Sequence, residues 1–334
     1  MAKAAVPVID ISPYRRGDRD GRRTLAAEVD RTCREIGFMV IAGHGVDPHL
    51  IEAVESTSRA FFDLPLAEKM RIVRPAPDVT RGYMPLKAEV LVRSRGGDAK
   101  GDLNESLMIG PVDVTDAPYY TAPAAGRHFA PNLWPERPQG LREVYEAYYR
   151  VMDVLAIDLM RIFALALDLP EKYFDASVGR SISRLRVRNY PAPDVAPEPG
   201  QLRASAHSDY GSLTILKTED RPGGLQVQGS GGDWLDVPHV PGCFVVNIGD
   251  MLARWTNDRW VSTLHRVVNP PIERAVGSRR QSVVFFQNPN YDAVVSCLPS
   301  CADAAHPAKY PPTTSGGHLR EKFLATQQAI AYAD

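Results

Sequence analysis

The stretch AHSDYGSLTIL, residues 206 to 216, places a histidine and an aspartate two positions apart, at His207 and Asp209. In an extended strand, side chains at positions i and i+2 point to the same face, so both can reach one metal ion. Such a pair is a weak signal alone, because it is common by chance. The best candidate for a third ligand is His265 in VSTLHRVVNP, because it opens another β-type segment of the same region.

Two histidines and one carboxylate form a facial triad, the ligand set of non-haem iron(II) sites, which leaves positions open for other molecules. His207, Asp209 and His265 are therefore expected to be the metal ligands and the catalytic centre. The remaining histidines have no comparable sequence context and are interpreted as structural. They are His44, His49, His128, His239, His306 and His318.

A second chemical pattern follows in RRQSVVFF, where Arg280, Ser282, Val284 and Phe286 share one face of a strand. An arginine on an otherwise apolar face needs a partner, because an unpaired buried charge is costly. A guanidinium binds a carboxylate through two parallel hydrogen bonds, and the serine hydroxyl can add a third. The partner is either a bound carboxylate or an internal Asp or Glu, and the strand pattern does not decide between them.

Both patterns lie in a strand-rich region between residue 181 and about residue 290. Many short strands separated by Gly and Pro turns favour a β-sandwich or barrel over a parallel α/β sheet. The strand SLTILKT faces the predicted site with either Leu213 and Ile215 or Thr214 and Leu216, and period two leaves both faces open. The segments are SRLRVRNY, SLTILKT, GLQVQ, WLDVPHV, CFVVNIGD, HRVVNP and RRQSVVFFQN.

Helical patterns flank this region. Residues 141–169 have apolar residues at three- and four-residue steps, which predicts a long helix against which a sheet can pack. Residues 22–37 and 48–63 predict two shorter amphipathic helices, and a short helix is expected from residue 316. The segment from about 74 to 136 is rich in Pro, Gly and charged residues, and residues 93–102 within it are interpreted as a solvated loop.

The composition is that of an ordinary globular protein. The 334 residues carry a formal net charge of −1, which gives no support to a nucleic-acid or membrane-surface binder. No signal peptide or membrane-spanning stretch is found in the sequence. The cysteines are few and irregularly spaced, which favours free thiols and a cytoplasmic location. They are Cys33, Cys243, Cys297 and Cys301.

Together these motifs resemble the 2-oxoglutarate and Fe(II)-dependent dioxygenases, in particular the isopenicillin N synthase-like branch. The His-Ser-Asp motif at 207–209, His265 and the Arg-Gln-Ser motif at 280–282 form a compound pattern. The likeness covers nearly the whole chain. The motifs that carry it are VPVIDIS, GFMVIAGHGV, FFDLPLAEKM, RNYP, HSDYGSLTIL, GGLQV, VVNIGDML, WTNDRWVSTLHRV and YPPTT.

The resemblance implies an α+β fold with a double-stranded β-helix, or jelly roll, as its core. Flanking helices are expected, with the long helix packed on the sheet. An N-terminal mixed α/β region over residues 1–120 and a catalytic core over residues 121–334 would form one integrated unit.

The resemblance also implies roles for residues. The triad would bind Fe(II), Arg280 and Ser282 would hold the distal carboxylate of 2-oxoglutarate, Tyr190 would contact this cosubstrate, and Phe286 would help line the pocket. With O2 as oxidant, the enzyme would oxidise an unactivated C–H bond of a small molecule by hydroxylation, desaturation or cyclisation. A place in specialised metabolism is expected. A monomer is expected, with a weak oligomer left open.

Candidate substrate contacts come from three further places. Many relatives have Asn-x-Tyr-Pro where this chain has RNYP, so Arg188 replaces the asparagine and shares a strand face with Tyr190. Arg188 either binds a carboxylate of the substrate or of 2-oxoglutarate, or pairs with a neighbouring acidic residue. Glu105 and Met108, in a segment where relatives place a pocket-lining strand, and Met84 are the other candidates, with plain packing or surface exposure as the alternative for each.

Two other functions stay open at this point. An oxidase of the same fold that does not use 2-oxoglutarate, like isopenicillin N synthase or the aminocyclopropane carboxylate oxidase, would direct Arg280 and Ser282 to another anion. A non-catalytic ligand-binding homologue is the second alternative. The intact triad argues against it, because a pure binding protein has no need of an open iron site.

Overall fold

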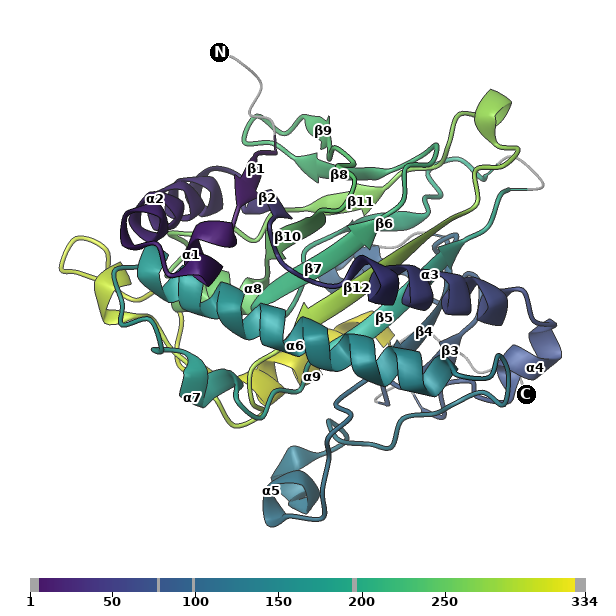
Figure 1. Ribbon diagram of the computed structural model, residues 1–334, viewed down its shortest axis with the longest axis horizontal. Helices are drawn as coiled ribbons and strands as arrows, with labels where there is room; N and C mark the ends of the chain where they lie inside the picture. Colours follow the sequence, from purple (N-terminus) through teal and green to yellow (C-terminus); the bar gives the residue numbers. More distant parts are fainter. Residues whose placement is uncertain (1–5, 77–78, 98–99, 194–196, 328–334) are drawn as a thin grey trace.

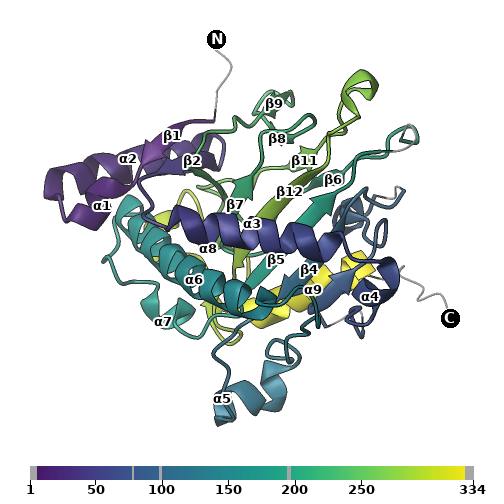
Figure 2. The ribbon, with the colours of Figure 1, turned by 45° about the vertical axis from the view of Figure 1, so that its right-hand side comes forward.

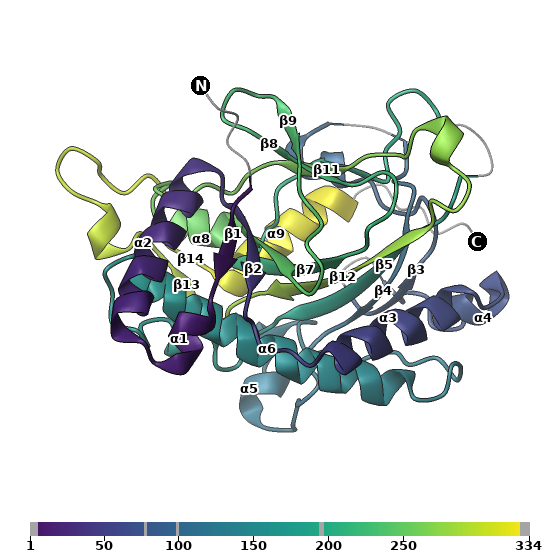
Figure 3. The same ribbon diagram turned by 45° about the horizontal axis from the view of Figure 1, so that its top comes forward.

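Two facing β-sheets form the centre of the molecule, and helices cover the outer side of the larger sheet (Figure 1). Figure 3 shows β8, β9 and β11 on one side and β5, β7 and β12 on the other. This arrangement confirms the predicted jelly roll within an α+β fold. The computed structural model describes residues 6–76, 79–97, 100–193 and 197–327.

The larger sheet has the strand order β1-β2-β10-β7-β12-β5-β4-β3. Strand β1 pairs with β2 in parallel, and the pairs that follow along this order are antiparallel. The bounds are β1 Val8–Asp10, β2 Phe38–Ala42, β3 Gly82–Met84, β4 Glu105–Ile109, β5 Arg184–Tyr190, β7 Leu213–Thr218, β10 Phe244–Ile248 and β12 Arg280–Gln287. Because β3 and β4 pair with β5, the sheet crosses the domain boundary expected near residue 120.

The smaller sheet has the order β6-β11-β8-β9. Its strands are β6 Ala204–His207, β8 Leu225–Gln228, β9 Trp234–Asp236 and β11 His265–Val267. A separate hairpin pairs β13 Val294–Val295 with β14 Thr313–Thr314. The smaller sheet matters for function because His207 ends β6 and His265 begins β11, and these two residues are paired in register.

Helix α6 supports the larger sheet from outside, together with α3 (Figure 2). Its inward stripe packs on the apolar side of β12, where the ring of Tyr149 lies 5.2 Å from that of Phe285. The helices are α1 Ser12–Arg16, α2 Arg19–Glu35, α3 Pro48–Phe62, α4 Leu66–Met70, α5 Pro118–Thr121, α6 Leu141–Ala166, α7 Asp175–Val178, α8 Asp250–Trp255 and α9 Ser315–Gln327. Short 3₁₀ turns are η1 Leu91–Arg95, η2 Pro123–Ala125, η3 Ile272–Arg274 and η4 Pro299–Cys301.

Alternation along the strands separates this core from the interior between the sheets. On β12, Val283 and Phe285 belong to the hydrophobic core beneath α6, whereas residues 280, 282, 284 and 286 face inward. Strand β7 alternates in the same way: Leu213 and Ile215 lie in the core, while Thr214 and Leu216 line the interior cavity. Of the two faces that the sequence left open, the one with Thr214 and Leu216 therefore faces the site.

The predicted helices form with small shifts at their ends. Helix α2 begins at Arg19, earlier than expected, because the Asp18 carboxylate accepts a hydrogen bond from the backbone N–H of Gly21 at 3.1 Å. Within the Pro- and Gly-rich segment 74–136, β3 and β4 extend the larger sheet, and β4 falls where the resemblance implied a pocket-lining strand.

None of the helices in the described ranges is long and apolar enough to cross a membrane. The cysteines are all free thiols, as expected from their spacing.

Candidate active site

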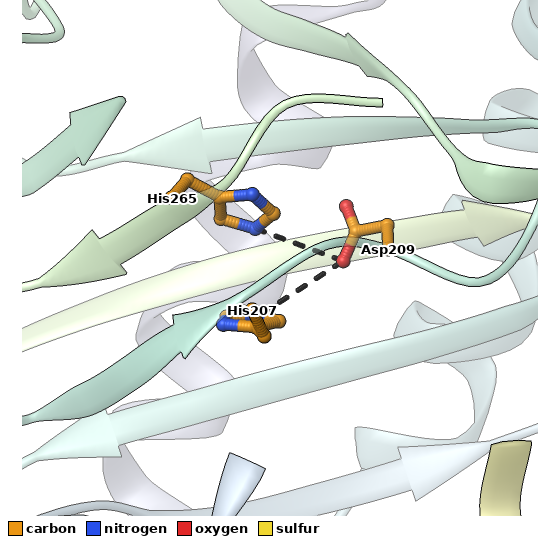
Figure 4. A group of neighbouring side chains, drawn as sticks. All are labelled: His207, Asp209 and His265. Atoms are coloured by element: carbon orange, nitrogen blue, oxygen red, sulfur yellow. Dashed lines mark ion pairs between the residues drawn. The ribbon is translucent and has the colours of Figure 1, made fainter. Parts of the chain in front are cut away.

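Three side chains converge between the two sheets, as Figure 4 shows. Oδ1 of Asp209 lies 4.0 Å from Nε2 of His207 and 3.7 Å from Nε2 of His265. One ligand atom from each residue lies within 4.8 Å of the other two, which is the spacing needed to hold one metal ion. Both members of the His-x-Asp pair were expected on one strand, but β6 ends at His207 and Asp209 lies in the irregular segment that follows.

Backbone carbonyls orient both imidazoles. Nδ1 of His207 lies 2.7 Å from the carbonyl oxygen of Ser205, and Nδ1 of His265 lies 3.2 Å from that of Thr263. A carbonyl oxygen can only accept, so each Nδ1 carries the proton and donates it. Each Nε2 is then left with a lone pair that faces the third ligand, as a metal ligand requires.

Two hydrogen bonds fix the orientation of the Asp209 carboxylate. Its Oδ2 accepts hydrogen bonds from Oγ1 of Thr214 at 2.6 Å and from Nδ2 of Asn247 at 2.7 Å. This leaves Oδ1 directed toward the two imidazoles. Asn247 was not identified from the sequence, although a buried amide within the apolar run FVVNI was a usable signal.

The protonation states favour metal binding. Burial, followed by the charge of the nearby His265, lowers the pKa of His207 to about 3, so its Nε2 is unprotonated at neutral pH. Burial raises the pKa of Asp209. The two imidazoles, and then the hydrogen bonds from Asn247 and Thr214, lower this pKa by more than burial raises it, so the net shift is downward. A neutral histidine and an ionised aspartate are the forms that bind a divalent cation.

A pocket between the two sheets opens on one side of the triad. We call it the cosubstrate pocket. Its walls come from the inward faces of strands in both sheets, and the residues that matter here are Tyr190, Thr218, Leu225, Arg280, Ser282 and Val284. The period-two prediction for β12 thus brings Arg280 and Ser282 to the same pocket as the triad.

Arg280 has the surroundings of a group that binds an anion. Its side chain is buried, and Nη1 donates to the carbonyl oxygen of Gly223 at 2.8 Å. Its Nε has no hydrogen-bond partner within the described part of the chain. The hydroxyl groups of Tyr190 and Ser282 lie 3.3 Å apart beside it. Arg280 has no ion pair among the described residues and keeps an unused buried N–H, which fits a bound carboxylate such as that of 2-oxoglutarate.

A second cavity opens on the other side of the triad. We call it the distal cavity. It shares His207, Asp209, Arg188 and Phe286 with the cosubstrate pocket, so the two spaces meet at the triad. Its other walls come from distant parts of the chain, and they include Met84, Leu91, Met108, Tyr210, Leu319 and Phe323.

Of the predicted substrate contacts, Met84 and Met108 line the distal cavity and Phe286 lines both spaces. Glu105 lines neither, so its predicted contact with substrate is not supported. Its carboxylate accepts hydrogen bonds from Nζ of Lys69 and from Nδ2 of Asn189, both at 2.8 Å, and another from the Tyr83 hydroxyl. Glu105 and Met108 are three positions apart on one strand, so they point to opposite faces.

Arg188 has an internal partner, which was one of its two expected roles. Its Nη1 donates to Oε2 of Glu89 at 2.8 Å and to Oδ1 of Asn104 at 3.0 Å. Arg188 still borders both spaces. Arg188 is one of three arginines on the same face of β5, with Arg184 and Arg186. The other two were not identified from the sequence, although RLRVRNY alternates in the same way as RRQSVVFF.

Two family models match the chain. The N-terminal model described as non-haem dioxygenase in morphine synthesis matches residues 6–137, and the model of the 2OG-Fe(II) oxygenase superfamily matches residues 181–289. The second match spans all three triad residues and Arg280.

Known proteins agree with these matches over nearly the full length. The chain is 37% identical to the 2-oxoglutarate-Fe(II) type oxidoreductase hxnY of Emericella nidulans, over 97% of this chain and 90% of that protein. It is 33% identical to a homoarginine-6-hydroxylase of Oryza sativa subsp. japonica, over 96% of this chain and 97% of that protein. The structure of a full-length Neurospora crassa protein solved with alpha-KG and thymine superimposes with a TM-score of 0.83 at 31% identity. The match covers 96% of this chain and 97% of that one. The chain therefore belongs to the 2-oxoglutarate/Fe(II)-dependent dioxygenases, which use Fe(II), 2-oxoglutarate and O2 to oxidise a small molecule.

Proposed function

We propose that the triad holds the iron, that Arg280, Ser282 and Tyr190 hold 2-oxoglutarate in the cosubstrate pocket, and that the distal cavity holds the small molecule whose C–H bond is oxidised. The observation that carries this proposal is the meeting of the two spaces at His207 and Asp209. A metal bound there would face both molecules at once, as an oxygenase that consumes a cosubstrate and a substrate requires.

The two ends of the cosubstrate pocket would divide the binding of 2-oxoglutarate. At one end, Arg280 offers its unused Nε–H to the distal carboxylate, and the Ser282 hydroxyl donates beside it. At the other end, the triad presents the metal to the keto acid. Tyr190 limits the width of the pocket near Arg280, since its ring centroid lies 5.8 Å from the guanidinium carbon.

The bound iron, with 2-oxoglutarate and O2, supplies the oxidising power that no side chain has. The protein fixes the geometry and excludes water. Thr214 and Asn247 keep Asp209 from rotating, and Phe286 separates the cosubstrate from the space where the C–H bond would lie.

The identity of the substrate does not follow from the relatives, because their named ligands differ in chemistry. Homoarginine is an amino acid, whereas thymine is a neutral base. The choice among hydroxylation, desaturation and cyclisation depends on that substrate. A role in specialised metabolism, a cytoplasmic location and a monomeric state stay predictions.

A single set of measurements tests the proposal. Purified protein is titrated with Fe(II) and 2-oxoglutarate under anaerobic conditions and then exposed to O2, and succinate release is measured. We expect one iron per chain, a visible charge-transfer absorption that needs both additions, and slow succinate formation without substrate. Absence of iron binding would contradict the enzyme assignment.

The same assay addresses the oxidase that does not use 2-oxoglutarate. Such an enzyme would bind iron and consume O2 without forming succinate. The open Nε of Arg280 fits either anion, but the 2-oxoglutarate-dependent relatives favour the leading proposal.

A further inference from the structure

The inward face of β5 carries three arginines in succession, at positions 184, 186 and 188, and all three line the distal cavity. Two of them share one carboxylate. Nη1 and Nη2 of Arg186 donate to Oε1 and Oε2 of Glu89, both at 2.9 Å, and Nη1 of Arg188 donates to Oε2 at 2.8 Å. Arg186 and Arg188 are therefore built into a closed ion-pair network at the cavity wall.

Arg184 is different, although it is equally buried at 5% exposure. Among the described residues it has no carboxylate partner and no hydrogen-bond acceptor, and its Nε is buried without a partner. Its close contact is the ring of Phe323 on α9, 4.4 Å from the guanidinium carbon, and a ring face attracts a cation without neutralising it.

The charged neighbours of Arg184 make its position more unfavourable. Burial, followed by the charges of Arg81 and Arg74, lowers the pKa of Arg184 well below its usual value. Arg81 is itself buried and donates to neutral acceptors, the carbonyl oxygens of Thr80 and His128 at 2.9 and 2.6 Å. A buried cation beside other cations is retained at a cost in stability, and binding sites are where such costs are found.

The place of Arg184 rules out 2-oxoglutarate as the missing anion. Arg280 pairs in register with Tyr190, and Arg184 lies at the other end of β5, six residues away. At about 3.3 Å per residue that separation is roughly 20 Å, too long for one five-carbon dicarboxylate. Arg184 also lines only the distal cavity, on the substrate side of the triad.

Apolar side chains line another part of the wall around Arg184. Phe286 is its register partner on β12, Met108 is opposite Arg186 on β4, and Leu319 and Phe323 project from α9. A ligand that fills this space needs an anionic group at one end and an apolar body along the strand.

We propose that the substrate is an organic acid whose carboxylate is bound by Arg184, with an apolar body that extends past Phe286 to the triad. This inference rests on the proposed function, because it assigns the distal cavity to the substrate. Phe323 stacks on Arg184 and holds the guanidinium for a two-pronged contact with the carboxylate.

The first test uses stability in the absence of metal and ligands. Arg184→Met removes an uncompensated buried cation, so the melting temperature should rise. Arg186→Met, the matched control on the same strand face, leaves Glu89 with a single partner and should lower it. If Arg184→Met lowered the melting temperature as much as Arg186→Met, Arg184 would be structural and the proposal would fail.

The second test uses binding to the anaerobic Fe(II)–2-oxoglutarate protein. Phenylbutyrate, cinnamate and octanoate are each compared with their primary amides by the change they cause in the charge-transfer absorption. We expect at least one acid to bind about tenfold or more tightly than its amide, and Arg184→Met to remove that preference. Arg142→Gln, an exposed substitution on α6, should keep it.

The outcomes separate the two proposals. Wild-type protein that shows no charge-transfer absorption would contradict the proposed function itself. Normal absorption with no acid preferred over its amide would overturn the role of Arg184 while leaving the iron site intact. Preference for phenyl phosphate over every carboxylate would overturn the assignment of a carboxylic acid.

Discussion

The cosubstrate pocket and the distal cavity meet at the triad but are built differently. The first is lined by residues of seven strands, β5, β6, β7, β8, β10, β11 and β12, together with Asp209 just after β6. The second adds residues from β3, β4, η1 and α9, which lie outside the jelly-roll strands. If the proposed assignment of the two spaces holds, the cosubstrate side is built from strands, whereas the substrate side adds segments whose side chains can differ without disturbing those strands.

The two spaces also differ in how their arginines are paired. In the cosubstrate pocket, Arg280 has a backbone carbonyl as partner, whereas Arg188 at the border of both spaces is paired with Glu89. On the distal side, Glu89 fixes two arginines and leaves Arg184 without a counter-ion among the described residues. Under the proposals above, Arg280 would bind the cosubstrate carboxylate, and Arg184 would bind the substrate beside the paired Arg186 and Arg188.

The largest effect is expected where the two spaces meet. His207→Ala or Asp209→Ala should abolish succinate release, because two ligands do not hold iron in the open geometry that the reaction needs. The fold should be retained, since the core beneath α6 is apolar and separate from the triad. Succinate assays and thermal unfolding check both statements. His306→Ala is the control, because this histidine is exposed and its ring pairs with Asp303, away from the triad. Near-normal activity of either variant would refute the ligand assignment.

A smaller effect is expected at the far end of the cosubstrate pocket. Arg280→Lys should raise the KM for 2-oxoglutarate about tenfold to a hundredfold, because one ammonium group cannot reproduce the planar fork of donors. The KM for the substrate should change little, since Arg280 does not line the distal cavity. Steady-state kinetics measure both constants. Arg266→Lys, which changes an arginine stacked on Trp234 outside both spaces, is the matched control. An unchanged KM for 2-oxoglutarate would mean that another group holds its carboxylate.

Much of the cosubstrate side was predictable from sequence, because its residues lie on short strands where period two determines the face. The set 280, 282, 284 and 286 followed from that rule, whereas the triad followed from the family resemblance, because Asp209 lies beyond the end of β6. The distal side was predicted poorly, because Glu89 meets Arg186 across 97 positions and no local pattern encodes such a contact. The predicted substrate contact of Glu105 is not supported for a local reason, because Glu105 and Met108 are three positions apart on one strand and point to opposite faces.

The ion pairs of the distal wall should make stability depend on pH. Burial raises the pKa of Glu89, but the charges of Arg186 and then Arg188 more than reverse this and lower it well below its usual value. A depressed folded-state pKa contributes stability that is complete above the unfolded value of about 4.3 and is lost as the pH falls below it. Unfolding free energy should therefore decrease below about pH 5 more steeply in the wild type than in Glu89→Gln.

At neutral pH, Glu89→Gln should lower the free energy of unfolding by about 3 kcal/mol, because two buried arginines lose their counter-ion. Denaturant unfolding over a pH series measures both effects. Glu136→Gln is the control, since that carboxylate is exposed and pairs with Arg71 at the surface. Parallel pH profiles of wild type and Glu89→Gln would show that the arginines are neutralised elsewhere.

The smallest effect is expected between the two faces of β4. Met108→Ala should raise the KM for substrate several-fold, because it removes apolar contact from the distal cavity. Glu105→Gln should leave that KM unchanged and lower the melting temperature instead, because the buried Lys69 ammonium loses its charged partner. Kinetics and thermal unfolding of the two variants, measured together, separate a cavity residue from a structural one on the same strand. A raised KM in Glu105→Gln without loss of stability would place its carboxylate on the substrate side after all, and the boundary of the distal cavity would have to be redrawn across β4.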